Sequence, residues 1–508
     1  MSATHLVDRP PLSFATRLAY AVGAVANAVK MRGLTIFLMI FYNQVVGLPA
    51  ETVGGILMLA LVFDAFIDPT VGQISDNFRS KLGRRHPFMY MAAVPVSVAY
   101  FLLWNPPKDW SHEAIAGYLL ACLLTVRLFD TFFELPHNAL APELAKDYHE
   151  RTKLLSLRAM FTVAGGLGMT LMAYQVFLKE HADGTGGVLA RDGYLSYSIA
   201  AALLIFTTIL ISTRGTQNQV PYLRAAPTRK ITFAAMLREV AATLNNRAFV
   251  VATLAGMFIA IAMGARNGLE IYIGLFFWGL KQSQLALLTS VGVVGSLLGV
   301  LLAAPVAKHL GKKYGAIAMF TTALALGLAP IAARLLGLMP PNGSEVLITI
   351  LMVETFLNAA MAVGTGVLLV SMTSDVIEDA EVKTGRRSEG LLLSADNLFK
   401  KIVSGMGIFI SGAILKAVEF PVGVKRGQID PEIVRNLGVA FLPTVGILFG
   451  LAIVCLFAFN IDKAKHEENL AKLKDTALQA KAAALEEDAG GLAGIAGGAA
   501  PSSQPARS

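Results

Sequence analysis

Long apolar blocks recur along almost the whole of this chain, and they limit how it can fold more than any other feature of the sequence. A block of about twenty apolar residues crosses the hydrocarbon core of a bilayer as a helix. Charged residues make up only 15% of the chain, whereas a soluble domain carries roughly a quarter. The sequence therefore predicts an all-α, polytopic membrane protein.

Twelve blocks are predicted to span the membrane. They cover residues 16–44, 52–72, 88–105, 114–141, 154–178, 194–213, 248–280, 283–305, 315–337, 345–374, 391–418 and 434–461. A weak internal repeat supports a division into two six-helix halves, because SKLGRRHPF follows the second span and KHLGKKYGA follows the eighth. Two related halves around a central site are the architecture of major facilitator transporters.

This division predicts four regions of the chain. Residues 1–213 form the first half, residues 214–247 a cytoplasmic connection, and residues 248–461 the second half. Residues 462–508 form a tail that begins as a solvent-exposed helix and ends in a low-complexity, disordered segment.

Basic residues gather in the loops that follow even-numbered spans, whereas VVGLPAE and MPPNGSE between other spans carry none. Loops rich in Lys and Arg stay in the cytoplasm, so we expect both termini there and the protein in the cell (inner) membrane. The same distribution accounts for the net charge of +8, and no nucleic-acid partner is expected. The basic loop residues are Arg79, Lys81, Arg84, Arg85, Lys146, Arg151, Lys153, Arg214, Arg224, Arg229, Lys230, Arg238, Arg247, Lys308, Lys312, Lys313, Lys383, Arg386 and Arg387.

Two carboxylates lie inside the second span, in FDAFIDP. Asp64 and Asp68 are four residues apart and share one helix face. A charge at the bilayer centre costs roughly 2.5–3.5 kcal/mol on insertion scales, so it marks a site. Two carboxylates facing a cavity suit Na⁺, which binds oxygen ligands, and they could equally share a proton. The alternative is a pair neutralised by basic residues of other helices.

A polar stripe runs along the fourth span, VRLFDTFFELPHNALAP. Its members are Arg127, Thr131, Glu134 and Asn138, with Asp130 and His137 beside them. This spacing keeps the four side chains on one helix face, which must contact protein or water rather than lipid. The Thr131 hydroxyl and the Glu134 carboxylate suit a cation or a solute. A purely structural polar seam between helices is the alternative.

Basic residues inside other spans are candidate partners for these acids. They are Lys30 and Arg32 in the first span, Arg158 in the fifth, Arg266 in the seventh, and Lys400 and Lys401 in the eleventh. A mid-span lysine can pair with the aspartates when no cation is bound and then release them. Lys400 and Lys401 point about 100° apart on a helix, so we expect only one of them to reach the cavity.

The loop GQISDNFRSKLGRRHPF carries a candidate gate. We expect Asp76, Arg84 and Arg85 to form ion pairs across the cytoplasmic ends of helices. Such pairs would hold an outward-facing state and break in an inward-facing one. The alternative is that these charges only determine topology.

FDAFIDP, followed by G, SD, R and LGRRHPF, resembles the second-helix signature of the glycoside–pentoside–hexuronide:cation symporters. The resemblance covers most of residues 14–460. It implies a major facilitator fold and cation-coupled transport by alternating access, with Na⁺ or H⁺ as coupling ion. It also implies that Asp64, Asp68 and Thr131 hold the cation (Na⁺). Glu134, Arg158 and Lys401 match solute-site positions of the family.

Departures from the galactoside branch affect the expected solute. A sugar-binding aspartate of that branch falls on Ala28, the basic residue before it on Asn27, and a stacking aromatic on Asn138. The animal sodium-dependent lysophosphatidylcholine symporters are also similar, at VAYFLLWNPP and LRAMFTVAGGLG. We therefore expect an amphipath such as a lysophospholipid, with Lys30, Arg32, Arg158 and Lys401 near its headgroup and Asn138 in the substrate site. A glycoside is the alternative.

Other functional classes lack sequence support. The chain contains no HExxH, GxSxG, Walker or paired-cysteine metal motif, so an enzyme is not expected. A channel has little need of a buried carboxylate pair with a lysine counter-charge. We expect a monomer that needs the lipid bilayer, a small-molecule substrate and a coupling ion, with no cofactor.

Overall fold

The computed structural model describes residues 12–145, 147–181, 186–223, 246–384, 389–424, 427–461, 465–475 and 478. These parts of the chain are helical apart from their loops and one isolated β-bridge between Glu180 and Gly186. Several predicted loop residues lie outside the described part: Lys146, Arg224, Arg229, Lys230, Arg238, Arg386 and Arg387. Most of the predicted connection 214–247 and the tail beyond residue 478 lie outside it too.

The first half contains the helices α1 and α3 to α7. Their bounds are α1 (Phe14–Arg32), α3 (Ala50–Asn77), α4 (His86–Leu103), α5 (His112–Leu144), α6 (Tyr148–Met172) and α7 (Asp192–Gln217). Beyond α1 the span continues through the π-helix η1 (Gly33–Phe37), α2 (Leu38–Ile40) and the π-helix η2 (Phe41–Val45), and α6 continues into η3 (Ala173–Phe177). A 3₁₀ turn, η4 (Val220–Tyr222), follows α7.

The second half contains α9 to α13. Their bounds are α9 (Arg247–Tyr272), extended by the π-helix η5 (Ile273–Phe277), then α10 (Gln282–Leu335), α11 (Glu345–Thr384), α12 (Glu389–Ala417) and α13 (Pro431–Ala458). Residues 465–475 form a further short helix, the tail helix. Polar caps begin several of these helices because they satisfy the first backbone N–H groups. Ser13, Ser111, Asp147, Asn246 and Asp430 cap α1, α5, α6, α9 and α13.

Eleven helices among the described residues are long and apolar enough to cross a membrane. The 54-residue α10 accounts for two crossings, because its backbone leaves helical geometry at Gly311, with φ 75° and ψ 162°. Only glycine adopts such angles readily. The side chain of Val306 lies against Gly315, so the chain folds back at this point. The fold therefore has the twelve predicted spans, although the eighth and ninth run further than expected into the turn between them.

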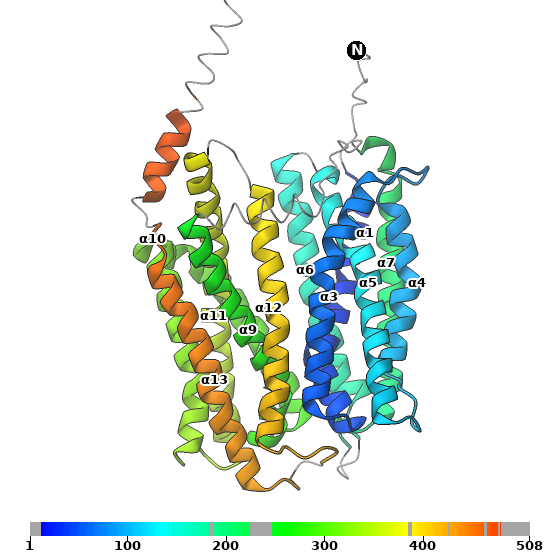
Figure 1. The fold of residues 1–508 in the computed structure, drawn as a ribbon, viewed down its shortest axis with the longest axis vertical. Helices are drawn as coiled ribbons and strands as arrows, with labels where there is room; N and C mark the ends of the chain where they lie inside the picture. The colour runs from blue at the N-terminus through cyan, green and yellow to red at the C-terminus, as the bar shows by residue number, and fades with distance from the viewer. Residues whose placement is uncertain are drawn as a thin grey trace, which may run out of the picture.

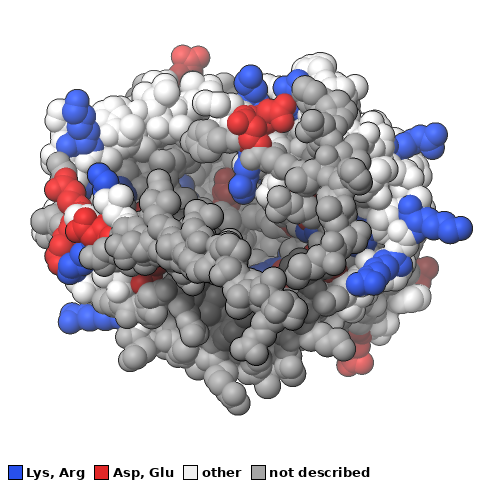
Figure 2. Space-filling model, turned by 90° about the horizontal axis from the view of Figure 1, so that it is seen from above, with Lys and Arg blue, Asp and Glu red and all other residues white. Residues whose placement is uncertain are grey.

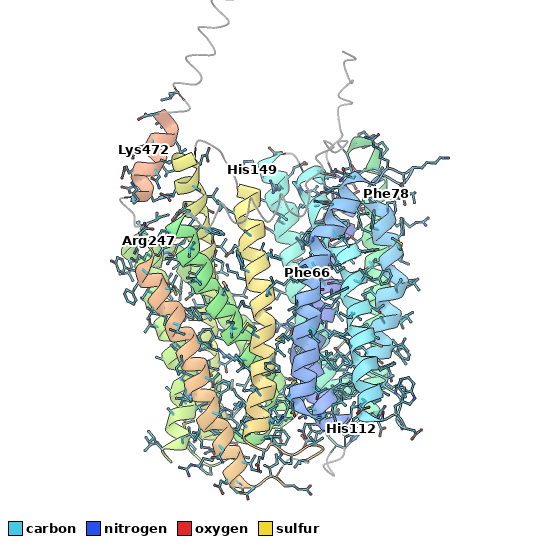
Figure 3. All side chains as sticks on the ribbon, in the orientation of Figure 1. Phe66, Phe78, His112, His149, Arg247 and Lys472 are labelled. Carbon is cyan, nitrogen blue, oxygen red and sulfur yellow. The ribbon has the colours of Figure 1, made fainter. Side chains whose placement is uncertain are left out.

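The two halves stand side by side in Figure 1, with α3 and α12 at their junction. Both the start of α1 and the tail helix lie at one end of the molecule, which we call the termini face. Phe78, His149, Arg247 and Lys472 lie toward this face, and His112 lies at the opposite face (Figure 3). Seen from the termini face, the centre of the molecule is hollowed, and charged side chains are visible at depth (Figure 2).

At the opposite face the halves meet closely. Tyr272 donates a hydrogen bond of 2.7 Å to the Asn43 side chain, and Gln44 Nε2 donates one of 3.0 Å to the Pro421 carbonyl. A Cβ atom on Gly412 would lie 2.5 Å from the Ala50 carbonyl oxygen, so α12 and α3 touch through their backbones there. The opposite face is sealed where these elements meet.

Candidate functional site

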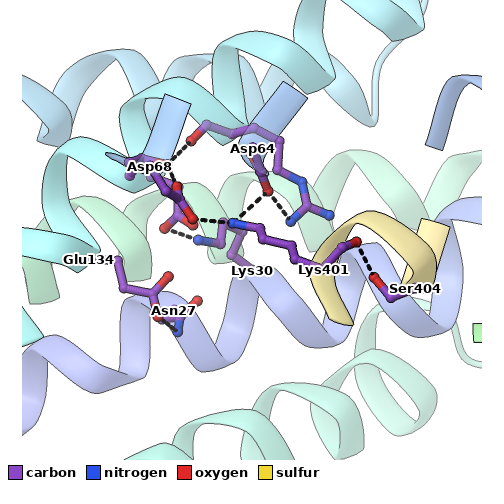
Figure 4. A network of polar contacts seen from close by, with 10 residues as sticks. Asn27, Lys30, Asp64, Asp68, Glu134, Lys401 and Ser404 are labelled. Atoms are coloured by element: carbon purple, nitrogen blue, oxygen red, sulfur yellow. Dashed lines mark hydrogen bonds and ion pairs between the residues drawn. The ribbon is translucent and has the colours of Figure 1, made fainter. Parts of the chain in front are cut away.

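A cluster of charged side chains joins the two halves near the middle of α3 (Figure 4). Asp64 and Asp68 come from α3, and the Lys401 ammonium reaches them from α12 in the other half. It contacts the Asp68 carboxylate and lies 3.4 Å from Asp64 Oδ2. One lysine of the second half therefore bridges both carboxylates of the first.

The polar stripe of α5 completes this cluster. The Thr131 hydroxyl donates a 2.8 Å hydrogen bond to Asp68, and Arg127 Nη1 donates a 3.1 Å bond to Asp64. The predicted cation ligands, Asp64, Asp68 and Thr131, thus lie together. Arg127 is a partner that the sequence analysis left out of the site, although it belongs to the same helical stripe.

The donor set of this cluster fits a hard cation. Asp64 is 3% exposed, and its Oδ1 is buried without a hydrogen-bond partner. A buried unsatisfied polar atom costs about 1–3 kcal/mol. Asp64 Oδ1, the Asp68 carboxylate and the Thr131 hydroxyl would together offer the oxygen ligands that Na⁺ requires.

A second ion pair lies next to the first, between α1 and α5. Lys30, which is 1% exposed, contacts the Asp130 carboxylate. One turn away, Asn27 Nδ2 donates a 3.0 Å hydrogen bond to Glu134. Lys30 is thus engaged with Asp130 in a buried pair, in line with its place among the basic candidate partners of the intramembrane acids.

This buried pair yields a stability prediction. Removing one partner of a buried ion pair typically costs 3–5 kcal/mol, because the remaining charge stays buried without compensation. We expect Lys30→Met to lower the thermal midpoint of the purified protein strongly. The double variant Lys30→Met/Asp130→Leu should recover most of that loss. An equal loss in both variants would show that the pair does not set the stability of this region.

The predicted solute-binding residues differ in whether their side chains are already hydrogen-bonded or are exposed. Arg158 of α6 donates to the Asn138 side chain of α5, so it too is already engaged. Arg32 is exposed at the end of α1 and lies beside Gly166 of α6. Glu270 of α9 is also exposed, and both it and Arg32 act electrostatically on the buried Tyr174. Apart from its charge within an apolar span, nothing in the sequence indicates that Glu270 belongs to this region.

Lys400 behaves as its helical position predicts. Its ammonium lies 2.5 Å from Asp396 on the same helix, and Asp396 also accepts a hydrogen bond of 3.2 Å from Thr253. Lys401, about 100° further round the helix, reaches α3 instead. Of the two adjacent lysines, only Lys401 joins the acidic cluster.

The candidate gate residues form ion pairs within one half. Arg84 contacts Glu143, and Arg85 lies 3.0 Å from Glu143 Oε1 and 3.4 Å from Asp76 Oδ1. Glu143 belongs to α5 and Asp76 to α3, so these pairs tie two helices of the first half. They are intact in a structure hollowed at the termini face. The expected ion pairs therefore form and hold α3 to α5, and their breaking in an inward-facing state stays a prediction.

Comparison with known proteins places this arrangement among transporters. A family model described as MFS/sugar transport protein matches residues 19–463. The uncharacterized symporter sll1374 of Synechocystis sp. is 25% identical over 90% of this chain and 96% of its own length. The glucuronide carrier protein homolog of Escherichia coli is 23% identical, covering 89% and 94% of the two chains. The isoprimeverose transporter of Lactiplantibacillus pentosus is 23% identical, covering 94% and 95%.

Solved structures agree on the fold. A bacterial homologue of the human lysosomal transporter Spinster, solved in an inward-facing and unoccupied conformation, superposes with a TM-score of 0.59 at 14% identity. The match covers 90% of this chain and 97% of that one.

Proposed function

Because the chain belongs to the MFS/sugar transport protein family, which makes it a membrane transporter and not an enzyme, we propose that it couples the movement of a cation to that of an organic solute. One observation carries the coupling: Lys401 of one half occupies the space between Asp64 and Asp68 of the other. A cation bound by these carboxylates would displace the lysine. The same event would break the bridge between the halves.

Na⁺ fits this site better than a proton does. A proton needs only one carboxylate, whereas the cluster also aligns the neutral Thr131 hydroxyl with Asp68 at 2.8 Å. Neutral oxygen ligands suit a metal cation. All these groups come from one chain, which fits a transporter that acts as a monomer.

The orientation in the membrane follows from the loops. The termini face carries the arginine-rich loop between α3 and α4, and such loops remain in the cytoplasm. The protein would then lie in the cell (inner) membrane with both termini cytoplasmic. In that orientation the hollowed face in Figure 2 opens inward and the sealed face points outward. Alternating access would reverse the two.

The solute proposed here is an organic molecule with an anionic group. Lys30 and Arg158 are engaged with Asp130 and Asn138, which leaves the exposed Arg32 as the first-half cation best placed to bind an anion. The exposed Glu270 could receive a cationic or hydroxyl group of the same solute. Two sources share this chemistry: a lysophospholipid headgroup and an acidic sugar such as a glucuronide. The glucuronide carrier protein homolog among the relatives supports the second source.

Substitution of Arg32 tests whether the solute carries an anionic group. A hydrogen bond to a charged group contributes about 1.5–3 kcal/mol, which is roughly 10- to 150-fold in affinity. We expect Na⁺-dependent thermal stabilisation by a lysophospholipid or by a methyl glucuronide, weakened at least about tenfold in Arg32→Gln and also reduced in Arg158→Ala.

Arg435→Gln is the matched control, because Arg435 is exposed on α13 and belongs to no part of the site. Stabilisation by only one of the two ligands would identify the source of the anion. Binding of a neutral glycoside that Arg32→Gln does not change would reverse the proposal in favour of a neutral sugar, as the isoprimeverose relative would suggest.

A further inference from the structure

The tail helix docks on the end of α11 at the termini face (Figure 1). His466 of the tail helix places its Nδ1 atom 3.1 Å from Glu378 Oε2 and 3.3 Å from Asp375 Oδ1. Asn469, one turn further along, is 1% exposed and donates a 3.4 Å hydrogen bond to Asp379. Tail and α11 therefore meet through polar groups.

The contact leaves electron-rich atoms facing one another. His466 Nδ1 and Glu378 Oε2 are both buried without a hydrogen-bond partner. The amide oxygen of Asn469, in the same contact, is also buried and unpartnered. A carboxylate oxygen carries no hydrogen, so a close approach between it and an imidazole nitrogen needs either a hydrogen on that nitrogen or a metal ion between them.

The geometry points to a metal ion, and we propose that Asp375, Glu378 and His466 bind a divalent transition metal such as Zn²⁺. Ligand atoms at about 2.0–2.1 Å from tetrahedral Zn²⁺ stand roughly 3.3 Å from each other. The two distances from His466 Nδ1 match that edge, and all three ligand atoms lie within 4.8 Å of one another. Imidazole and carboxylate are ligands that Zn²⁺ accepts.

Lys312 sets the charge of the site. Its ammonium lies 2.5 Å from Asp375 Oδ1 and so balances one of the two carboxylates. Both carboxylates face the imidazole, and the oxygen of Glu378 lies slightly nearer to it. Lys312 would orient Asp375 from outside the metal ligands, as outer groups do in metal sites.

A metal ion bound at this site would anchor the tail helix to the second half. Asp379 receives hydrogen bonds of 3.4 Å from Asn469 of the tail and from Asn246, the residue that caps α9. A metal ion beside it would fix the tail to α11, and Asp379 connects this contact to α9 through Asn246. This site lies apart from Asp64 and Asp68, so it does not rest on the proposed transport function.

The test uses the full-length protein with any affinity tag removed. We expect equilibrium dialysis with Zn²⁺ to show one tightly bound ion per chain, and Co²⁺ to give the visible absorption of a tetrahedral site. His466→Ala and Glu378→Gln should each weaken Zn²⁺ binding at least about 100-fold. His309→Ala, an exposed histidine of α10, and Asp68→Asn should leave it unchanged.

Glu378→Gln keeps the result interpretable even if His466→Ala releases the tail helix. Zn²⁺ binding that neither variant weakens would overturn the proposal. Absence of stoichiometric binding to the unmodified protein would also overturn it, and would leave an N–H group of His466 as the contact with the carboxylates.

Discussion

Asp68→Asn is expected to abolish Na⁺-driven accumulation of the solute while the protein still folds. Two unit charges 4 Å apart interact by about 4 kcal/mol at an effective dielectric constant of 20, which is about a thousandfold in affinity. An amide in place of Asp68 removes that attraction for the cation but keeps its size. Its carbonyl oxygen can still accept the Thr131 hydrogen bond.

The measurement is the uptake of labelled solute into proteoliposomes under an inward Na⁺ gradient. Asp68 is the better choice than Asp64, because Asp64→Asn would leave Arg127 buried with its carboxylate partner gone. Asp109→Asn, on an exposed loop, is the matched control. Accumulation against a gradient by Asp68→Asn would remove this carboxylate from the coupling site.

Lys401→Met should have two opposite effects. The lysine competes with the cation for Asp64 and Asp68, so its removal is expected to tighten Na⁺ binding at least about tenfold. The variant also loses the ion pairs that join α12 to α3. Cation binding then no longer breaks a bridge between the halves, so we expect accumulation of the solute to be lost.

Na⁺ titration of the purified protein, followed by calorimetry, separates these effects from a folding defect. Lys400→Met is the control, because Lys400 pairs with Asp396 on its own helix. It should bind Na⁺ like the unmodified protein. Weaker or unchanged Na⁺ binding in Lys401→Met would mean that the lysine supports the site instead of competing for it.

Much of the fold was predictable because the backbone N–H and C=O groups of each membrane span must hydrogen-bond within the span itself. The apolar blocks accordingly become helices, including the two spans that meet at Gly311. Helical periodicity also placed Thr131 on the face of α5 that meets Asp68. These features depend on local sequence, so they can be read without knowing which helices are neighbours.

The pairing of charges was less predictable. Lys30 pairs with Asp130, residues that lie on α1 and α5, and His466 meets Asp375 from a helix beyond the last span. Such contacts depend on the rotation and order of helices in the bundle, which periodicity within one helix does not determine. The sequence shows which intramembrane residues are charged, but it does not determine which of them pair with one another.

Lys401 and Gly412 lie on the same helix, α12, and this arrangement has a mechanical consequence. Lys401 reaches the acidic cluster, while Gly412 touches the backbone of α3 at the sealed face. Eleven residues of helix rise about 16 Å between them. A helix is stiff over that length, so under the proposed coupling a displacement of Lys401 by the cation would move α12 as a rigid body and shift its contact with α3 at the sealed face. In this proposal no relay through intervening loops is needed, because the helix itself would carry the displacement to the far side of the bundle.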